Sequence, residues 1–126
     1  MSIDADILRA AIQTVAGIRG VRMNPDSVAD DVILLATAIA DEEPFACAVA
    51  NVARAIQQLA AGKVEGTPLT GVFEGWSSFH FQSERKNGVP ANMRVVYRRN
   101  GGVTEVLGFG HRWLPSDVYA AISSRA

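Results

Sequence analysis

The residues best suited to chemistry lie in the C-terminal half of the chain. Between positions 85 and 112 there is one acid, Glu105, and six cationic side chains, which are Arg85, Lys86, Arg94, Arg98, Arg99 and Arg112. Arginine grips a phosphate through a fork of N–H donors, and such a local excess can hold a polyanion. His80 and His111 lie near this segment, and the ordinary pKa of histidine suits proton transfer near neutrality. The set therefore predicts either a phosphate site or a solvated face of a sheet.

Charge is divided unevenly along the chain, although the net charge is only −1. Residues 1–62 carry eight acids against four arginines, whereas residues 63–126 carry eight Lys or Arg against five acids. The nearly neutral net charge by itself says nothing about a polyanionic partner. The basic C-terminal half can nevertheless hold phosphate locally. The 126 residues fit a single domain, 1–126.

The first half of the chain has the apolar spacing of helices. A first helix ends at Gly17 or Gly20, and further helices are expected over 28–41 and 44–61. The sequence Asn24-Pro25-Asp26-Ser27 is typical of a helix start. In the third helix one apolar seam is expected to be buried against a sheet: Phe45, Val49, Val52, Ile56 and Leu59.

The second half alternates as strands do. Strands are expected over 76–83, 93–99 and 103–111, with a connecting loop over 63–75, a turn at Asn87-Gly88 and a tight hairpin at Asn100-Gly101-Gly102. A short helix or turn is expected to follow 115–117. Helices followed by a meander predict an α+β fold, with N-terminal helices packed on one face of a twisted antiparallel sheet of three to four strands.

Three sequence pieces in order resemble the RelE/ParE superfamily of toxins from toxin–antitoxin systems. They are Leu69-Thr70-Gly71 leading to Trp76, then Met93-Arg94-Val95-Val96-Tyr97, then Val106 to Arg112 with Val118-Tyr119 behind. The resemblance implies a RelE-like region over 18–122, with a short first strand within 18–23, and an extra N-terminal helix over 1–17. The chain departs from the family in its low net charge, in a longer hairpin between 81 and 94, and in an insert between 112 and 119.

The resemblance also implies an activity. Ribonucleases of this family cleave messenger RNA on the ribosome without a metal or other cofactor, by driving a 2′-hydroxyl onto the neighbouring phosphate. Arg94 and Arg112 match two family arginines that hold phosphate, Tyr119 matches a C-terminal tyrosine, and His111 lies where some members carry a histidine. These four are the expected catalytic residues. RNA-binding residues are expected on the facing strand and hairpin, without a residue-level match: His80, Arg85 and Lys86, with Glu84 beside them.

Plainer roles remain open for each of these residues. Arg94 could instead be a solvent-exposed charge at the edge of the sheet. Arg112 and Tyr119 could instead hold a C-terminal helix against the sheet. His111 alternates with Leu107 and Phe109, so it would also suit a hydrogen-bonded histidine at the edge of the core. We further expect Arg94, Arg112 and the Arg85–Lys86 hairpin to line one concave surface.

Three classes of function follow from the resemblance. The first is a ribosome-dependent endoribonuclease toxin with a cognate antitoxin protein as partner. The second is a ParE-like toxin that binds DNA gyrase and needs no acid–base residues, and the third is a noncatalytic interaction module. No apolar run approaches a membrane span, and residues 1–6 carry two acids and no basic segment, so a cytoplasmic protein without a membrane partner is expected. The single cysteine, Cys47, is expected in the core.

Overall fold

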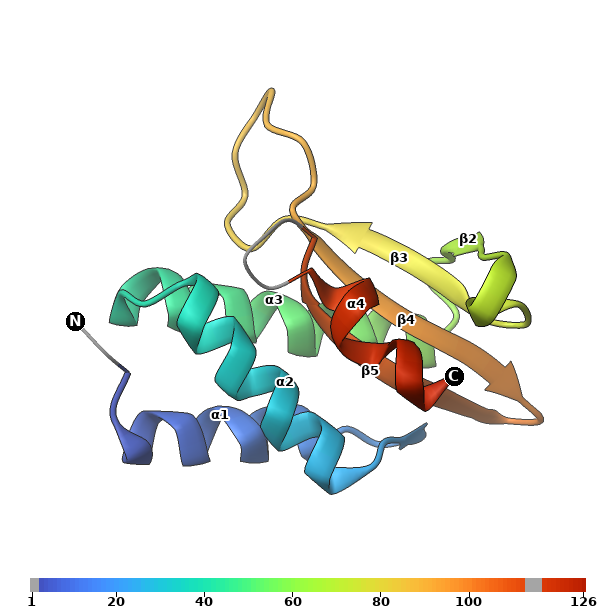
Figure 1. The fold of residues 1–126 in the computed structure, drawn as a ribbon, viewed down its shortest axis with the longest axis horizontal. Helices are drawn as coiled ribbons and strands as arrows, with labels where there is room; N and C mark the ends of the chain where they lie inside the picture. Colours follow the sequence, from blue (N-terminus) through green and yellow to red (C-terminus); the bar gives the residue numbers. More distant parts are fainter. Residues whose placement is uncertain (1–2, 113–116) are drawn as a thin grey trace.

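The computed structural model describes residues 3–112 and 117–126. Their order is three helices, with one short strand after the first of them, followed by four strands and a short C-terminal helix (Figure 1). The helices are α1 (Ala5–Ala16), α2 (Pro25–Ala38), α3 (Glu42–Ala60) and α4 (Val118–Ile122), and the strands are β1 (Val21–Arg22), β2 (Thr67–Pro68), β3 (Ser77–Phe81), β4 (Met93–Asn100) and β5 (Val103–His111). Two 3₁₀ turns, η1 (Gly71–Phe73) and η2 (Ser123–Arg125), complete the described elements. The predicted α+β class is confirmed.

The sheet has five strands in the order β1-β5-β4-β3-β2. The central hairpin strands β3, β4 and β5 are antiparallel, as predicted, but β1 runs parallel to β5. The expected strand count of three to four was therefore slightly low. Both edge strands are two residues long. β1 lies within the short first strand that the resemblance implied at 18–23, whereas β2 lies inside the segment predicted as a loop and is the additional strand.

Helix starts follow the local signals in the sequence. The Asn24 side chain accepts hydrogen bonds from the backbone N–H groups of Asp26 (2.9 Å) and Ser27 (3.4 Å), with Pro25 in the first turn. These bonds satisfy donors that a helix start otherwise leaves without partners. Asp4 caps α1 in the same way through the N–H of Ile7 (2.9 Å). The caps set where α1 and α2 begin, and so where their apolar faces point.

Helices α2 and α3 pack on one face of the sheet, and α1 packs on both of these helices. The predicted seam of α3 is confirmed as buried, with Ile56, Val52 and Leu59 at 0% exposure. It shares one hydrophobic core with side chains of β4 and β5, among them Met93, Val95 and Phe109. A smaller second core lies on the other face, where α4 and η1 cover the sheet: Phe73, Trp76, Val96, Val118 and Ile122. The two faces therefore differ in how fully they are covered.

A bulge in β5 changes which residues face which layer. Val96 lies opposite Gly108 but Tyr97 lies opposite Val106, so Leu107 is an extra residue in the strand. Gly108 is needed at this point because a Cβ there would come within 2.6 Å of Ile122 Cγ2 and 3.0 Å of Asp31 Oδ2. The glycine thus lets α4 and α2 approach the strand closely.

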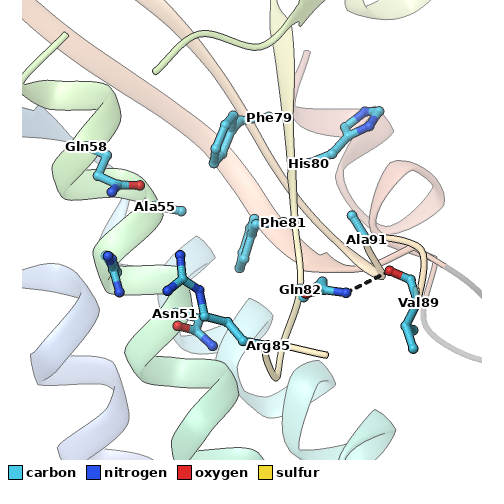
Figure 2. Close-up of a pocket in the computed structure, with 11 residues that line it drawn as sticks. Asn51, Ala55, Gln58, Phe79, His80, Phe81, Gln82, Arg85, Val89 and Ala91 are labelled. Carbon is cyan, nitrogen blue, oxygen red and sulfur yellow. Dashed lines mark hydrogen bonds between the residues drawn. The ribbon is translucent and has the colours of Figure 1, made fainter. Parts of the chain in front are cut away.

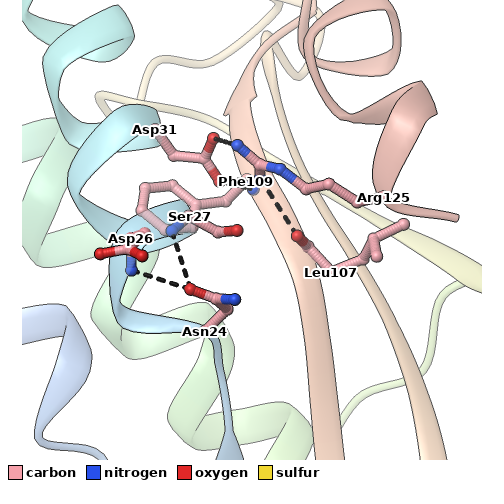
Figure 3. A network of polar contacts seen from close by, with 7 residues as sticks. All are labelled: Asn24, Asp26, Ser27, Asp31, Leu107, Phe109 and Arg125. Atoms are coloured by element: carbon pink, nitrogen blue, oxygen red, sulfur yellow. Dashed lines mark hydrogen bonds and ion pairs between the residues drawn. The ribbon is translucent and has the colours of Figure 1, made fainter.

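A buried ion pair joins α2 to the C-terminal segment at this bulge (Figure 3). Arg125 donates two hydrogen bonds to the carboxylate of Asp31, at 2.9 and 3.0 Å, and a third to the carbonyl oxygen of Leu107 at 3.2 Å. Asp31 also accepts from the N–H of Phe109 at 3.2 Å. Burial raises the pKa of the Asp31 carboxyl, and the bonds from Arg125 oppose that rise. We call this pair the Asp31–Arg125 clamp.

Candidate functional site

Strand register places the first two site residues side by side. His80 of β3 lies directly opposite Arg94 of β4, and Arg94 lies opposite Gly110 of β5. Directly opposed residues point to the same face of a sheet. Gly110 has no side chain, and Val118 of α4 packs over it, because a Cβ at this position would lie 3.4 Å from the Val118 Cβ. His80 and Arg94 are thus neighbours on the face that carries α4.

An open pocket of about 520 Å³ forms around this pair. We call it the α4-side pocket; its lining residues are Thr67, Leu69, Thr70, Phe73, His80, Arg94, Arg112 and Tyr119. Three of the four predicted catalytic residues, Arg94, Arg112 and Tyr119, are therefore brought together, and His80 joins them. The described lining carries two arginines and no carboxylate, a composition that favours an anion.

The Arg94 guanidinium is held by the backbone of its own strand. Its Nη1 donates to the carbonyl oxygens of Ala91 and Met93, both at 2.9 Å. Its Nε is buried and has no hydrogen-bond partner within 3–112 and 117–126. A buried donor without a partner is costly, so the described contacts satisfy this guanidinium only in part.

Arg112 and Tyr119 are held by several contacts at the mouth of the pocket. The Arg112 guanidinium carbon lies 5.3 Å from the centre of the Tyr119 ring, and Nη1 lies 3.6 Å from the Asp117 carboxylate. The Tyr119 hydroxyl shares a hydrogen bond of 2.7 Å with the hydroxyl of Ser78, which is buried under the pocket. The tyrosine hydroxyl is thereby fixed in position.

The electrostatics favour a neutral His80. His80 is exposed on its strand, but partial desolvation of the imidazole lowers its pKa, and the nearby charges of Arg94 and Arg112 lower it further. Because its pKa is lowered, the His80 imidazole stays unprotonated to a lower pH than the imidazole of an ordinary histidine does. At neutral pH His80 is therefore a proton acceptor beside two cations.

His111 does not line the α4-side pocket. It lies opposite Met93, which is fully buried in the helix-side core, so the two side chains point toward the helices. The expectation that His111 and Arg112 share one site overlooked that consecutive strand residues point to opposite faces. The same rule separates Arg98, which stacks over Trp76 at 4.2 Å, from Arg99, which donates to the carbonyl oxygen of Leu59 at 3.0 Å.

Arg85 lies on the other side of β3 from Arg94. It lines a separate pocket of about 370 Å³, which we call the α3-side pocket (Figure 2). Its other lining residues are Asn51, Arg54, Ala55, Gln58, Phe79, His80, Phe81, Gln82, Val89 and Ala91. Lys86 is among the described lining residues of neither pocket. The predicted single surface for Arg94, Arg112 and the Arg85–Lys86 hairpin is therefore wrong, because an edge strand divides it.

Some pocket residues carried no signal in the sequence. The bond between Ser78 and Tyr119 could not be predicted from local sequence, because the two residues are 41 positions apart. Asp117, which binds Arg112, and the pocket-lining Thr67 come from segments predicted only as turn or loop. Arg54 was counted only in the charge balance, although it lies one turn from Gln58 on the face of α3 that lines the second pocket.

Residues 3–112 and 117–126 contain neither a cluster of metal-binding side chains nor a membrane-spanning helix. No group of three or more His, Cys, Asp or Glu side chains is arranged to hold a metal ion. No helix in the same part of the chain is long and apolar enough to cross a membrane. In comparisons with known proteins, no family model, curated protein or solved structure matched the chain.

Proposed function

We propose that the chain is a toxin that cleaves messenger RNA on the ribosome, and that the α4-side pocket is its active site. The observation that carries this proposal is the grouping of His80, Arg94, Arg112 and Tyr119 around one open pocket. Internal cleavage of RNA needs a base for the 2′-hydroxyl, cationic donors for the pentavalent phosphate and an acid for the leaving oxygen. The four side chains supply each of these groups.

In the proposed reaction, His80 removes the proton of the 2′-hydroxyl. The 2′-oxygen then bonds to the adjacent phosphorus as the bond from phosphorus to the 5′-oxygen breaks, leaving a 2′,3′-cyclic phosphate and a 5′-hydroxyl. Arg94 and Arg112 hold the phosphate oxygens as their negative charge grows, and the Tyr119 hydroxyl donates a proton to the leaving oxygen. The lowered pKa of His80 supports its role as the base.

The ribosome and a cognate antitoxin enter this proposal through the RelE/ParE resemblance of the C-terminal half. The order of the elements is consistent with it: a short first strand, two helices and a three-strand meander. Two features set the chain apart from the family pattern. The histidine that lines the pocket with Arg94 and Arg112 is His80 rather than His111. The net charge of the chain is −1.

Purified protein added to a bacterial translation extract tests the proposal. We expect cleavage of a defined transcript at sites within the open reading frame, with 2′,3′-cyclic phosphate ends. Arg94→Ala should reduce the cleavage rate by about 10²–10³, the cost of removing one donor to a developing oxyanion. Arg98→Ala is the matched control, because Arg98 is on the same strand but pairs with Glu105 at 3.1 Å outside the pocket.

Three outcomes would contradict the proposal. Intact transcripts with wild-type protein would discard the nuclease activity. In bacteria that express the protein, growth arrest with intact transcripts and stalled replication would support a gyrase-binding toxin instead. Equal cleavage rates for Arg94→Ala and Arg98→Ala would place the reaction away from this pocket.

A further inference from the structure

The α3-side pocket carries two arginines without an ionic partner. Arg54 comes from α3 and Arg85 from the long loop between β3 and β4. Neither forms an ion pair with any residue in 3–112 or 117–126, whereas Arg22, Arg98 and Arg125 each pair with a carboxylate. The described lining contains no acid. Two unpaired cations facing one hollow repel each other, and an anion between them relieves that repulsion.

Aromatic rings line the same pocket as the two arginines. The Phe79 and Phe81 rings lie nearly parallel, 6.2 Å apart and inclined by 15°. Figure 2 shows both rings and the Gln58 amide on the helix side of β3, with the His80 ring on the opposite side of the strand. Aromatic rings next to arginines are the combination with which proteins bind single-stranded nucleic acid, because bases stack and phosphates pair with the cations.

The volume and position of the pocket also fit a nucleotide. At about 370 Å³ it lies in the range of pockets that hold small organic ligands. It is separated from the α4-side pocket only by β3, and His80 lines both. Within the described chain β2 pairs only with Ser77 and Ser78, so no strand covers the edge of β3 beside His80. An extended polymer can therefore pass from one pocket to the other over this edge.

We propose that the α3-side pocket binds a nucleotide of the RNA strand that flanks the cleaved bond, with Arg54 and Arg85 on its phosphates and a base against Phe79 and Phe81. This inference rests on the proposed function for the identity of the polymer. An acidic peptide would also match the two arginines. The parallel aromatic rings and the short crossing to the α4-side pocket favour RNA.

Fluorescence anisotropy with labelled oligouridylates, 2′-O-methylated throughout to prevent cleavage, tests the proposal on the full chain. The probes are four and twelve nucleotides long. We expect Arg54→Ala/Arg85→Ala to weaken binding of the longer probe by at least about tenfold. The slope of log affinity against log salt should fall by about 1.4, because each phosphate contact to a single strand contributes about 0.7. Phe81→Leu should weaken the longer probe by about fivefold or more.

The control is Arg9→Ala/Arg98→Ala, which removes the same charge from ion-paired arginines that line neither pocket. Circular dichroism melting verifies that each variant folds. Equal affinity of wild type and Arg54→Ala/Arg85→Ala for the longer probe would overturn the inference. It would also be overturned if hexaglutamate displaced that probe at the same concentration as unlabelled oligouridylate does. Weaker binding by Arg54→Ala/Arg85→Ala, together with unchanged binding of both probes by Arg94→Ala, would support this inference while contradicting the proposed active site.

Discussion

On one face of the sheet, three helices bury the side chains of β4 and β5 in a continuous core; on the other, a five-residue helix and two 3₁₀ turns cover only part of the surface (Figure 1). The same strands serve both faces, with Val95 turned toward the helices and Arg94 toward the α4-side pocket. A fully covered face contributes stability, because apolar area leaves water there. A partly covered face leaves room for charged side chains and a ligand. Substitutions on the two faces should therefore change different measured quantities.

The two histidines test this difference most directly, since they lie on opposite faces. His80→Ala should lower the rate of RNA cleavage by about 10²–10⁴, the usual effect of removing a general base. His111→Ala should leave the rate per folded molecule unchanged. Single-turnover cleavage, normalised to the folded fraction, measures both. A larger loss of rate for His111→Ala than for His80→Ala would reverse the assignment of the two faces.

The Asp31–Arg125 clamp holds the two layers together across the edge of β5. Arg125→Ala should reduce the free energy of unfolding by about 3–5 kcal/mol, because it leaves a buried carboxylate without its cation. Asp31 is 2% exposed, so water does not replace the lost bonds. Urea unfolding measures the change, and Arg9→Ala, in an exposed pair with Asp6, should have little effect. Equal midpoints for the two variants would show that the clamp does not stabilise the fold.

The helix-side core should respond in stability alone. Ile56→Ala should cost about 2–5 kcal/mol of unfolding free energy, as truncations of buried aliphatic side chains do, because Ile56 is fully buried against the sheet. Ile33→Ala on α2 is the matched control, since Ile33 is 50% exposed. Thermal melting compares the two. If Ile56→Ala melted with the wild type, the packing of α3 on the sheet would be wrong.

The smallest effect expected is on the titration of His80. Arg94→Gln removes one of the charges that lower the pKa of its imidazole, so that pKa should rise toward the ordinary value. Below the new pKa the ring is protonated, so the protonated form should persist to a higher pH than in the wild type. NMR titration of the two histidine rings measures this without any substrate. Arg98→Gln should leave the titration of His80 in place, and an equal shift in both variants would refute the local cause.

Local signals predicted most of the fold. The Asn24 cap, the four-three spacing of α3 and the hairpin at Asn100-Gly101-Gly102 each act between residues close in sequence, and the structure confirms the elements that they predict. The parallel pairing of β1 with β5 was missed because it depends on a partner more than 80 residues away. The Asp31–Arg125 clamp was also missed, although Asp31 shares the buried face of α2 with Val28, Val32 and Leu35, because its partner lies 94 residues away.

The site was predicted in part, and each difference follows from the geometry of strands. Arg94, Arg112 and Tyr119 do lie around one pocket. His111 was placed with them because it adjoins Arg112 in sequence, but that adjacency puts it on the opposite face. Arg85 was placed with them by charge alone, and charge in a sequence does not indicate on which side of an edge strand a loop lies.

The pairing of β1 with β5 also affects the order in which the chain can fold during synthesis. The N–H of Thr104 bonds to the carbonyl oxygen of Gly20 at 3.1 Å, so the first strand is made long before the strand beside which it lies. Contacts between such distant residues slow folding, because a long loop must close before they form. A growing chain therefore exposes the apolar faces of α1, α2 and α3 until β4 and β5 have been synthesised. The α4-side pocket, which needs Tyr119, is completed last.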